Sequence, residues 1–479
     1  VMRRIVGYDY LLGLFLIFIF FAYSLCSIFT CDSEYYITCI LPIVYIIGYL
    51  VWGFFSYNTA VLIKKIVMLL MAVKMVLIPG LIILNQGFEA SRFNEQIFSY
   101  IPDAVFLQIV EFVIVLVCVT FTKWSNFSLD YSPFSVDGSD FEKVASKNVW
   151  RVLGFCILII LVTIIVFPAF LNRLRPIFFL NETTEIYWKK NADLALNSLP
   201  SIIYYPINWL FIASRLALAY MMVVKIYKSK IRMTDGMKLF VSLITTIVIL
   251  VLIVPDSVAT SVYAALTIFL LLYILYPQKR KSIMIVVITV CIAVLLGAFV
   301  IMPITSGRGV SVNYIATKLN AYFSGYVNTA AAVAMDNYPS SRLDMLAGDF
   351  FRSLPILRGL FTSMPMSNEL FNVALGYDTV YNSQIIPLEG QGYYYLSYFG
   401  TIVFTMFHMY ILKKFYRKVA YSQSSFTFYV YGILTLIMVF GLVMYGAFLC
   451  FSLVLEQIPL LLINALFVRR EQDESINLS

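Results

Sequence analysis

A polar interval from Thr305 to Gln391 interrupts a chain that is otherwise strongly apolar, and it carries charges of both signs. Its basic residues are Arg308, Lys318, Arg342, Arg352 and Arg358, and its acidic residues are Asp336, Asp344, Asp349, Glu369, Asp378 and Glu389. The planar donors of a guanidinium group match phosphate oxygens, so arginines beside a lipid surface suit a lipid-linked phosphate or pyrophosphate. They also suit lipid headgroups or neighbouring acids, as the spacing of Asp349 and Arg352 illustrates.

Arg308 differs from the other basic residues in its position. It lies in Thr305-Ser306-Gly307-Arg308-Gly309, directly after a predicted membrane span. The flanking glycines allow close approach of the backbone. We therefore expect the Arg308 side chain to turn toward the mouth of the helix bundle.

Four charged residues fall at membrane depth, where a charge is costly unless it is paired or faces a cavity. Lys74 and Glu111 lie at similar depth in adjacent predicted spans, which predicts a structural ion pair. Arg215 lies near the middle of its span. It either lines a cavity or pairs with Glu456, and the sequence favours neither over the other.

The composition excludes a soluble globular protein. Hydrophobic residues make up 61% of the chain, charged residues only 13%, and the mean hydropathy is +0.88. Soluble domains carry about 25% charged residues. The chain is therefore expected to be an all-α polytopic membrane protein, and its net charge of +8 needs no nucleic acid partner.

Metal and redox sites are not expected. The seven cysteines show none of the paired spacings of zinc or redox motifs. The single histidine, His408, excludes an imidazole-rich metal site and is predicted to serve in packing or hydrogen bonding. The sequence predicts no cofactor.

Apolar runs predict about twelve transmembrane helices. They lie at 10–30, 35–57, 62–84, 102–122, 149–171, 201–224, 238–255, 257–276, 282–303, 392–412, 426–446 and 448–468. The long run 426–468 is split near Gly441–Gly446, because one helix of that length would overshoot the bilayer. The first run is long enough to span and lacks the small-residue cleavage site of a signal peptide.

Loop charges orient these helices. Lys and Arg residues such as Lys64, Lys65 and Arg280 fall on one side, which the positive-inside rule assigns to the cytoplasm. Residues 305–391 then form a large extracytoplasmic loop between helices one to nine (1–304) and helices ten to twelve with a cytoplasmic tail (392–479). All three parts belong to one integral membrane domain.

Two amphipathic helices are expected inside this loop. The first carries apolar residues at three- and four-residue spacing: Ile315, Leu319, Tyr322, Phe323, Tyr326, Ala330 and Val333. The second has Leu343, Leu346, Phe350 and Leu354 and stops near Pro355. We expect both to lie at the membrane surface and to roof the bundle.

This plan resembles the bacterial Wzy-type oligosaccharide repeat unit polymerases of O-antigen, capsule and enterobacterial common antigen synthesis. The likeness is sharpest from Arg308 to Leu412. It includes Tyr322-Phe323-Ser324-Gly325-Tyr326, Asp349-Phe350-Phe351 leading to Pro355, an Asn-bearing stretch like Asn368 or Asn372, and the loop exit from Pro387 to Gly400. Two arginines that many members carry are absent: Pro255-Asp256-Ser257 replaces one and Tyr445-Gly446 the other.

The resemblance implies a GT-C-like fold and metal-independent glycosyl transfer. A growing glycan would move from undecaprenyl pyrophosphate to the terminal sugar of an incoming lipid-linked repeat unit. Arg308 and Arg215, assisted by Arg352 or Arg358, would hold the pyrophosphate. Glu389 would be the first candidate for the base, then Asp336 or Asp349; the alternative for Glu389 is that it caps helix ten. Tyr322, Tyr326 and Tyr393 would bind sugar.

The implied setting is the bacterial cytoplasmic (inner) membrane, with the active site facing the periplasm or exterior. Membrane lipid, a chain-length regulator and a flippase are the further partners expected. Two alternatives remain open. An O-antigen ligase typically carries a histidine in its large loop, and this loop has none. A flippase or other transporter would predict pseudo-symmetric halves and a charged central cavity.

Overall fold

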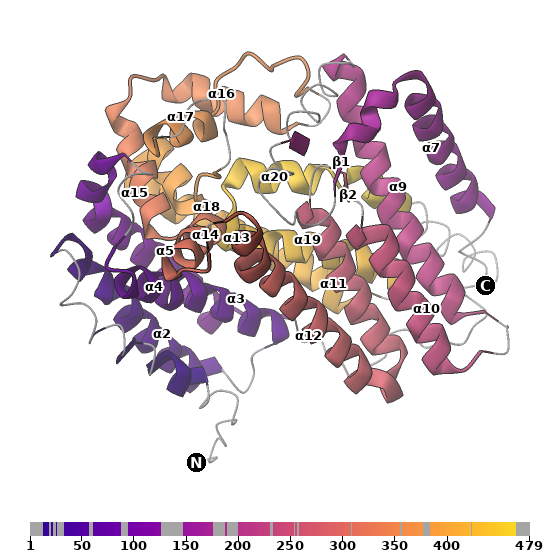
Figure 1. Ribbon diagram of the computed structural model, residues 1–479, viewed down its shortest axis with the longest axis horizontal. Coiled ribbons are helices and arrows are strands. Elements are labelled where there is room, and N and C mark those ends of the chain that lie inside the picture. The colour runs from indigo at the N-terminus through magenta and orange to yellow at the C-terminus, as the bar shows by residue number, and fades with distance from the viewer. Residues whose placement is uncertain are drawn as a thin grey trace.

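The computed structural model describes residues 13–18, 21–22, 25, 33–56, 61–87, 94–125, 147–175, 187–188, 200–229, 233–252, 254–255, 258–307, 309–354, 357–376, 384–422 and 424–465. Helices account for nearly all of these residues (Figure 1). The chain is thus an all-α polytopic membrane protein, as its composition predicts.

The first part of the chain forms η1 (Ser33–Cys39), α2 (Ile40–Ser56), α3 (Leu62–Ala72), the π-helical turn η3 (Val73–Leu77), α4 (Ile78–Leu84), η5 (Glu95–Tyr100) and α5 (Ile101–Phe121). The middle part forms α7 (Lys147–Val166), η6 (Pro168–Arg173), β1 (Leu174–Arg175), α9 (Ser201–Tyr227), α10 (Asp235–Ile247), η7 (Val248–Leu252), β2 (Val254–Pro255), α11 (Val258–Leu275), η8 (Pro277–Lys279), α12 (Arg280–Leu296), η9 (Gly297–Ile301) and α13 (Met302–Thr305). Strands β1 and β2 pair antiparallel, with Leu174 opposite Pro255.

The predicted loop folds into α14 (Val312–Tyr322), α15 (Tyr326–Ala334), η10 (Met335–Asn337), α16 (Arg342–Ser353) and α17 (Ser367–Ala374). We call helices α14 to α17 the cap. The last part forms α18 (Leu388–Ala420), α19 (Ser425–Met444) and α20 (Ala447–Leu455).

Eight helical segments in the described ranges are long and apolar enough to cross a membrane. They are Ser33–Ser56, Leu62–Leu84, Glu95–Phe121, Ile202–Tyr227, Val258–Leu275, Pro277–Thr305, Leu388–Ala420 and Ser425–Met444. A ninth span is possible if Ala447–Leu455 and Ile458–Ala465, bent by 43°, cross together. The break at Tyr445–Gly446 confirms the predicted split of 426–468.

Three further predicted spans are not among these eight segments. Runs 149–171 and 238–255 coincide with α7 and with α10 followed by η7. Most of run 10–30 lies outside the described residues. The coarse prediction of a multi-pass helical protein is therefore confirmed.

Two hydrophobic cores hold the helices together. One joins α2 to α5 with the cap and α18, and the other joins α9 to α12 with α19 and α20. Figure 1 shows α18, α19 and α20 between the two groups. Large apolar side chains also remain exposed on outer faces, as lipid contact requires: only 11% of the Pro277–Thr305 window is buried.

The cap differs from the sequence prediction in two ways. The first amphipathic helix is broken into α14 and α15, because Ser324 takes a positive φ of 47° and the Asn320 amide occupies the space where a Cβ at Gly325 would lie. Second, α16 turns its predicted apolar side outward: Leu343 is 77% exposed, while Asp349 is buried. Hydrogen bonding of Asp349 explains this orientation, as described below.

Helix α18 begins at Leu388, so Glu389 and Gln391 lie in its first turn, whereas the sequence predicted them in the loop. The helix is sharply bent at Leu396 and Ser397, and Ser397 has a φ of 56°. The bend brings Gly392 and Gly400 together so closely that a Cβ on either would meet backbone of the other. The Tyr-rich start of α18 is thereby folded against its longer, membrane-spanning part.

Candidate functional site

Glu389, the first predicted base, is completely buried in the N-terminal half of the bundle. Its Oε1 lies 2.9 Å from Nζ of Lys74, and Lys74 lies 2.6 Å from Oε2 of Glu111. Thr329 also donates a 2.8 Å hydrogen bond to Glu389 Oε1. The predicted Lys74–Glu111 ion pair is confirmed, and Glu389 joins it to form what we call the buried triad.

Asp349, another predicted base, ties three helices together. Ser367 donates from both its backbone N–H and its hydroxyl, Gln391 donates at 2.8 Å, and Tyr395 donates at 2.7 Å. Burial raises the pKa of Asp349 above its ordinary value of 3.8, although these hydrogen bonds act in the opposite direction. Asp349 is only 1% exposed. Its hydrogen bonds to Ser367, Gln391 and Tyr395 hold α16 on α17 and α18.

Asp336 is the exposed member of the three predicted carboxylates. Its side chain is 38% exposed and accepts a 2.8 Å hydrogen bond from Arg342, which is 47% exposed. Arg342 also lies over the ring of Tyr394, at 5.6 Å from the centroid. A carboxylate and a guanidinium thus lie together on the exposed surface of the cap.

Tyrosines of α18 extend this exposed group. Tyr393 lies within electrostatic range of Asp336, Asp103 and Arg342, and its ring meets that of Tyr398 edge-on at 5.2 Å. Tyr398 donates a 3.2 Å hydrogen bond to Asp103. We call these five residues the polar cluster. The predicted sugar-binding residue Tyr393 and the predicted carboxylate Asp336 are therefore neighbours.

The predicted cations are spread over the molecule. Arg352 donates to Glu369 Oε1 at 2.8 Å and to the carbonyl of Met364 at 2.7 Å. Arg358 lies 5.1 Å from the ring centroid of Tyr205 on α9.

Arg215 donates to the Ser261 hydroxyl and, at 3.4 Å, to the Ile249 carbonyl, within the second core. Arg308 lies outside the described residues. The described cations therefore do not converge on one point.

The other two predicted sugar-binding tyrosines are separated from the polar cluster by burial or position. Tyr326 is fully buried at the start of α15. Tyr322 is 55% exposed at the end of α14 and lies within electrostatic range of Tyr445. Of the three tyrosines, Tyr393 alone belongs to the polar cluster.

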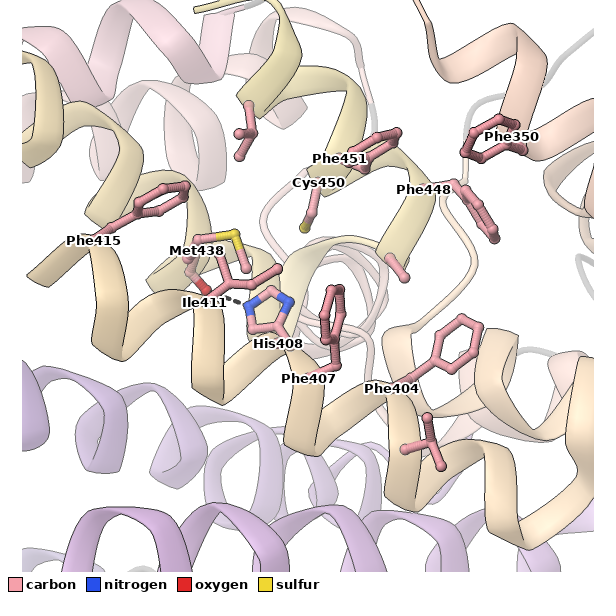
Figure 2. A pocket seen from close by; sticks show the side chains of 13 residues that line it. Phe350, Phe404, Phe407, His408, Ile411, Phe415, Met438, Phe448, Cys450 and Phe451 are labelled. Atoms are coloured by element: carbon pink, nitrogen blue, oxygen red, sulfur yellow. Dashed lines mark hydrogen bonds between the residues drawn. The ribbon is translucent and has the colours of Figure 1, made fainter. Parts of the chain in front are cut away.

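An apolar cavity of about 420 Å³ runs along one face of α18 (Figure 2). Side chains of α18 at three- and four-residue spacing form its floor: Val403, Phe404, Phe407, His408, Ile411 and Phe415. Met438 of α19, Phe448 and Phe451 of α20 and Phe350 of the cap complete the walls. From Val403 to Phe415 the helix rises by about 18 Å, so the cavity is long enough for an extended hydrocarbon chain.

His408 is the polar residue of this lining. Figure 2 shows its ring facing Met438, whose carbonyl lies 2.6 Å from His408 Nε2. This contact agrees with the predicted role of His408 in packing and hydrogen bonding. The cavity itself could not be predicted, because its lining residues have the same apolar pattern as any lipid-facing helix.

Two routes of contact connect the cavity with the polar cluster. Helix α16 carries Arg342 in its first turn and Phe350 eight residues later, which corresponds to about 12 Å along the axis. In parallel, Tyr394 hydrogen-bonds Ser340 at 2.7 Å beneath Arg342, and the adjacent Tyr395 packs on Phe404 and Phe448 of the cavity. An apolar cavity and an exposed charged group are thus held at a fixed spacing.

Sequence reasoning missed Arg342, Asp103 and Tyr398 as members of one group. Asp103 starts α5, whereas the other two lie in α16 and α18, and no periodicity links these elements. Comparisons of the chain with protein-family models, with curated proteins and with solved structures give no match.

Proposed function

We propose that this protein is a membrane glycosyltransferase that polymerises oligosaccharide repeat units carried on undecaprenyl pyrophosphate. The product would be a long-chain surface polysaccharide such as an O-antigen or capsule. The resemblance to Wzy-type polymerases suggests this activity. The arrangement of the apolar cavity and the polar cluster supports it.

One observation carries the proposal: α16 spans from Arg342 in the polar cluster to Phe350 in the cavity wall. A lipid-linked glycan has a long apolar chain, an anionic phosphate group and a polar sugar, in that order. The cavity suits the chain because its walls are aromatic and aliphatic. The guanidinium of Arg342 suits the phosphate, and Tyr393 and Tyr398 of the polar cluster offer rings and hydroxyls to sugar.

In the proposed reaction an acceptor hydroxyl oxygen attacks the anomeric carbon of the donor glycan. The bond between that carbon and the pyrophosphate oxygen breaks, and its electron pair stays on the leaving pyrophosphate. The guanidinium of Arg342 stabilises this developing charge. A carboxylate receives the hydroxyl proton.

Among the three carboxylates expected to act as base, Asp336 fits this role best. A base must come within hydrogen-bond reach of the proton that it removes. Asp336 is exposed beside Arg342 and Tyr393. Glu389 and Asp349 are buried and bonded to other protein groups. We therefore replace Glu389 with Asp336 as the proposed base.

A second candidate function is favoured by the buried triad. Intramembrane carboxylates are typical of proton relays in transporters. The same lipid-linked glycan would then be moved across the membrane in exchange for protons. This alternative predicts no new glycosidic bond.

An assay of the purified protein in detergent distinguishes the two functions. Purified protein supplied with undecaprenyl-pyrophosphate-linked repeat units, without nucleotide sugar or ion gradient, is expected to make a ladder of longer glycans. A flippase forms no product there, because detergent abolishes sidedness. Failure of the wild-type protein to extend its authentic substrate, together with translocation of that substrate in vesicles, would contradict polymerisation.

A further inference from the structure

The buried triad joins four elements that are distant in sequence. Lys74 comes from the π-helical turn η3, Glu111 from α5 and Glu389 from the first turn of α18. Thr329 of α15 donates to Glu389, and Gln108 of α5 donates to Thr329 at 3.1 Å. The triad therefore fastens the cap and the start of α18 to the N-terminal bundle.

The charges within the triad do not balance if every group is ionised. Two carboxylates would face one ammonium, and all three side chains are 0% exposed. Helices α2, α4 and α15, which pack around the triad, contain no Lys, Arg, Asp or Glu. Other packed elements do carry charged residues, such as Glu34 of η1, Lys64 and Lys65 of α3, Glu95 of η5, Asp103 of α5 and Lys413 of α18. Within the described ranges, none of these acts electrostatically on Lys74 or Glu111.

The hydrogen bonds show where a further proton is required. Glu111 Oε1 and Glu389 Oε2 are buried acceptors without a hydrogen-bond partner among the described residues. Both carboxyl groups contact the same ammonium nitrogen, Nζ of Lys74, at 2.6 Å and 2.9 Å, so they are near neighbours. A hydrogen bond between them needs one hydrogen, because two carboxylates have acceptors only. A single proton on this pair both balances the charge and supplies the missing donor.

We propose that Lys74, Glu111 and Glu389 form a proton-binding site in which the two carboxyl groups share one proton, and that this proton holds α15 and the start of α18 on the N-terminal bundle. Loss of the proton leaves two buried carboxylates beside the single ammonium of Lys74, and this excess negative charge favours separation of these elements. The site thus couples proton occupancy to the position of the cap. It is independent of the polymerase proposal.

Infrared spectroscopy tests the shared proton. Purified protein carrying Asp349→Asn, which removes the one further buried carboxyl group among the described residues, is expected to show a protonated-carboxyl C=O band at neutral pH. Glu111→Gln and Glu389→Gln should each abolish that band, because Lys74 then pairs with a single carboxylate. Glu369→Gln is the matched control, since Glu369 pairs with Arg352 at a partly exposed site, and it should leave the band unchanged.

Hydrogen exchange tests the coupling. After correction for the intrinsic pH dependence, exchange in residues 326–334 should increase in the wild-type protein as the pH rises, because the site loses its proton. The increase should be absent in Glu111→Gln and Glu389→Gln, which have no shared proton. Circular dichroism and size-exclusion chromatography establish that both variants fold. Two outcomes would overturn the proposal: a carboxyl band in Asp349→Asn protein that neither Gln substitution changes, or an equal rise in exchange in wild type, Glu111→Gln and Glu389→Gln. Neither readout requires glycan or catalysis.

Discussion

Nζ of Lys74 lies 2.9 Å from Oε1 of Glu389, although one residue belongs to the N-terminal bundle and the other follows the cap. Both side chains are fully buried. This contact fixes the point at which the chain returns from the cap into the membrane. It also explains why Glu389 lies inside a helix and not in an exposed loop.

Removing the cation of the triad should destabilise the protein strongly. Lys74→Met leaves two buried carboxyl groups without their ammonium, and loss of one partner from a buried ion pair costs about 3–5 kcal/mol. Adding Glu389→Gln should recover part of this loss. The measurement is the free energy of unfolding in detergent.

Lys418→Met provides the control for this series, because Lys418 is exposed on α18. Its effect should stay within about 0.5 kcal/mol. Equal stability of Lys74→Met and Lys418→Met would show that the triad contributes nothing to the fold.

The sequence predicted the membrane class, the helical loop and the Lys74–Glu111 pair, because each depends on local apolar pattern or on depth within a span. It did not predict the position of Glu389. That carboxylate is placed by Lys74 and Thr329, which are distant in the chain. For a similar reason, the sequence did not predict which face of α16 is exposed. The four donors to Asp349 outweigh the local apolar stripe in deciding which face is buried.

Asp349 should make the stability of the cap depend on pH. Burial raises the folded-state pKa above the ordinary value of 3.8, so between these two values the folded protein binds more protons than the unfolded chain. The contribution of Asp349 to stability therefore increases as the pH falls through that window, and it decreases as the pH rises.

Thermal unfolding of wild type and Asp349→Asn over a pH series measures this contribution. As the pH is lowered from neutral, the stability of the wild type should increase relative to that of Asp349→Asn. If the stability of the wild type relative to Asp349→Asn stayed constant or decreased as the pH fell, the result would be inconsistent with the raised pKa.

The side of the membrane that the cap occupies can be read by chemical labelling. Asp344 and Ser363 are exposed in the cap, whereas Ser367 is buried and unsuitable. Asp344→Cys and Ser363→Cys should react with an impermeant maleimide from the extracytoplasmic side, because the positive-inside rule predicts that the Lys- and Arg-rich loops face the cytoplasm. Lys418→Cys should react after inner-membrane lysis. The reverse labelling pattern would show that the cap lies on the cytoplasmic side.

Filling the apolar cavity should weaken binding of the lipid chain. Ala447→Phe places a ring among the lining residues of α18 and α20. Exclusion of about two methylene groups, at about 0.8 kcal/mol each, corresponds to a roughly tenfold increase in Kd. Undecaprenyl phosphate is the probe, and Phe399→Leu, at a position on α18 outside the cavity lining, is the control. An unchanged Kd in Ala447→Phe would remove the cavity from the binding site.

The rate of ladder formation by Asp336→Asn tests the proposed site most directly. Loss of an exposed ion pair with Arg342 costs only about 0–1 kcal/mol, so the variant should fold normally. Loss of a general base should slow polymerisation by about 10²–10⁴-fold, and Asp336→Glu should restore part of the rate. Asp344→Asn, which removes a neighbouring exposed carboxylate, should polymerise at the wild-type rate. A wild-type rate in Asp336→Asn would contradict the assignment of the polar cluster as the reaction site.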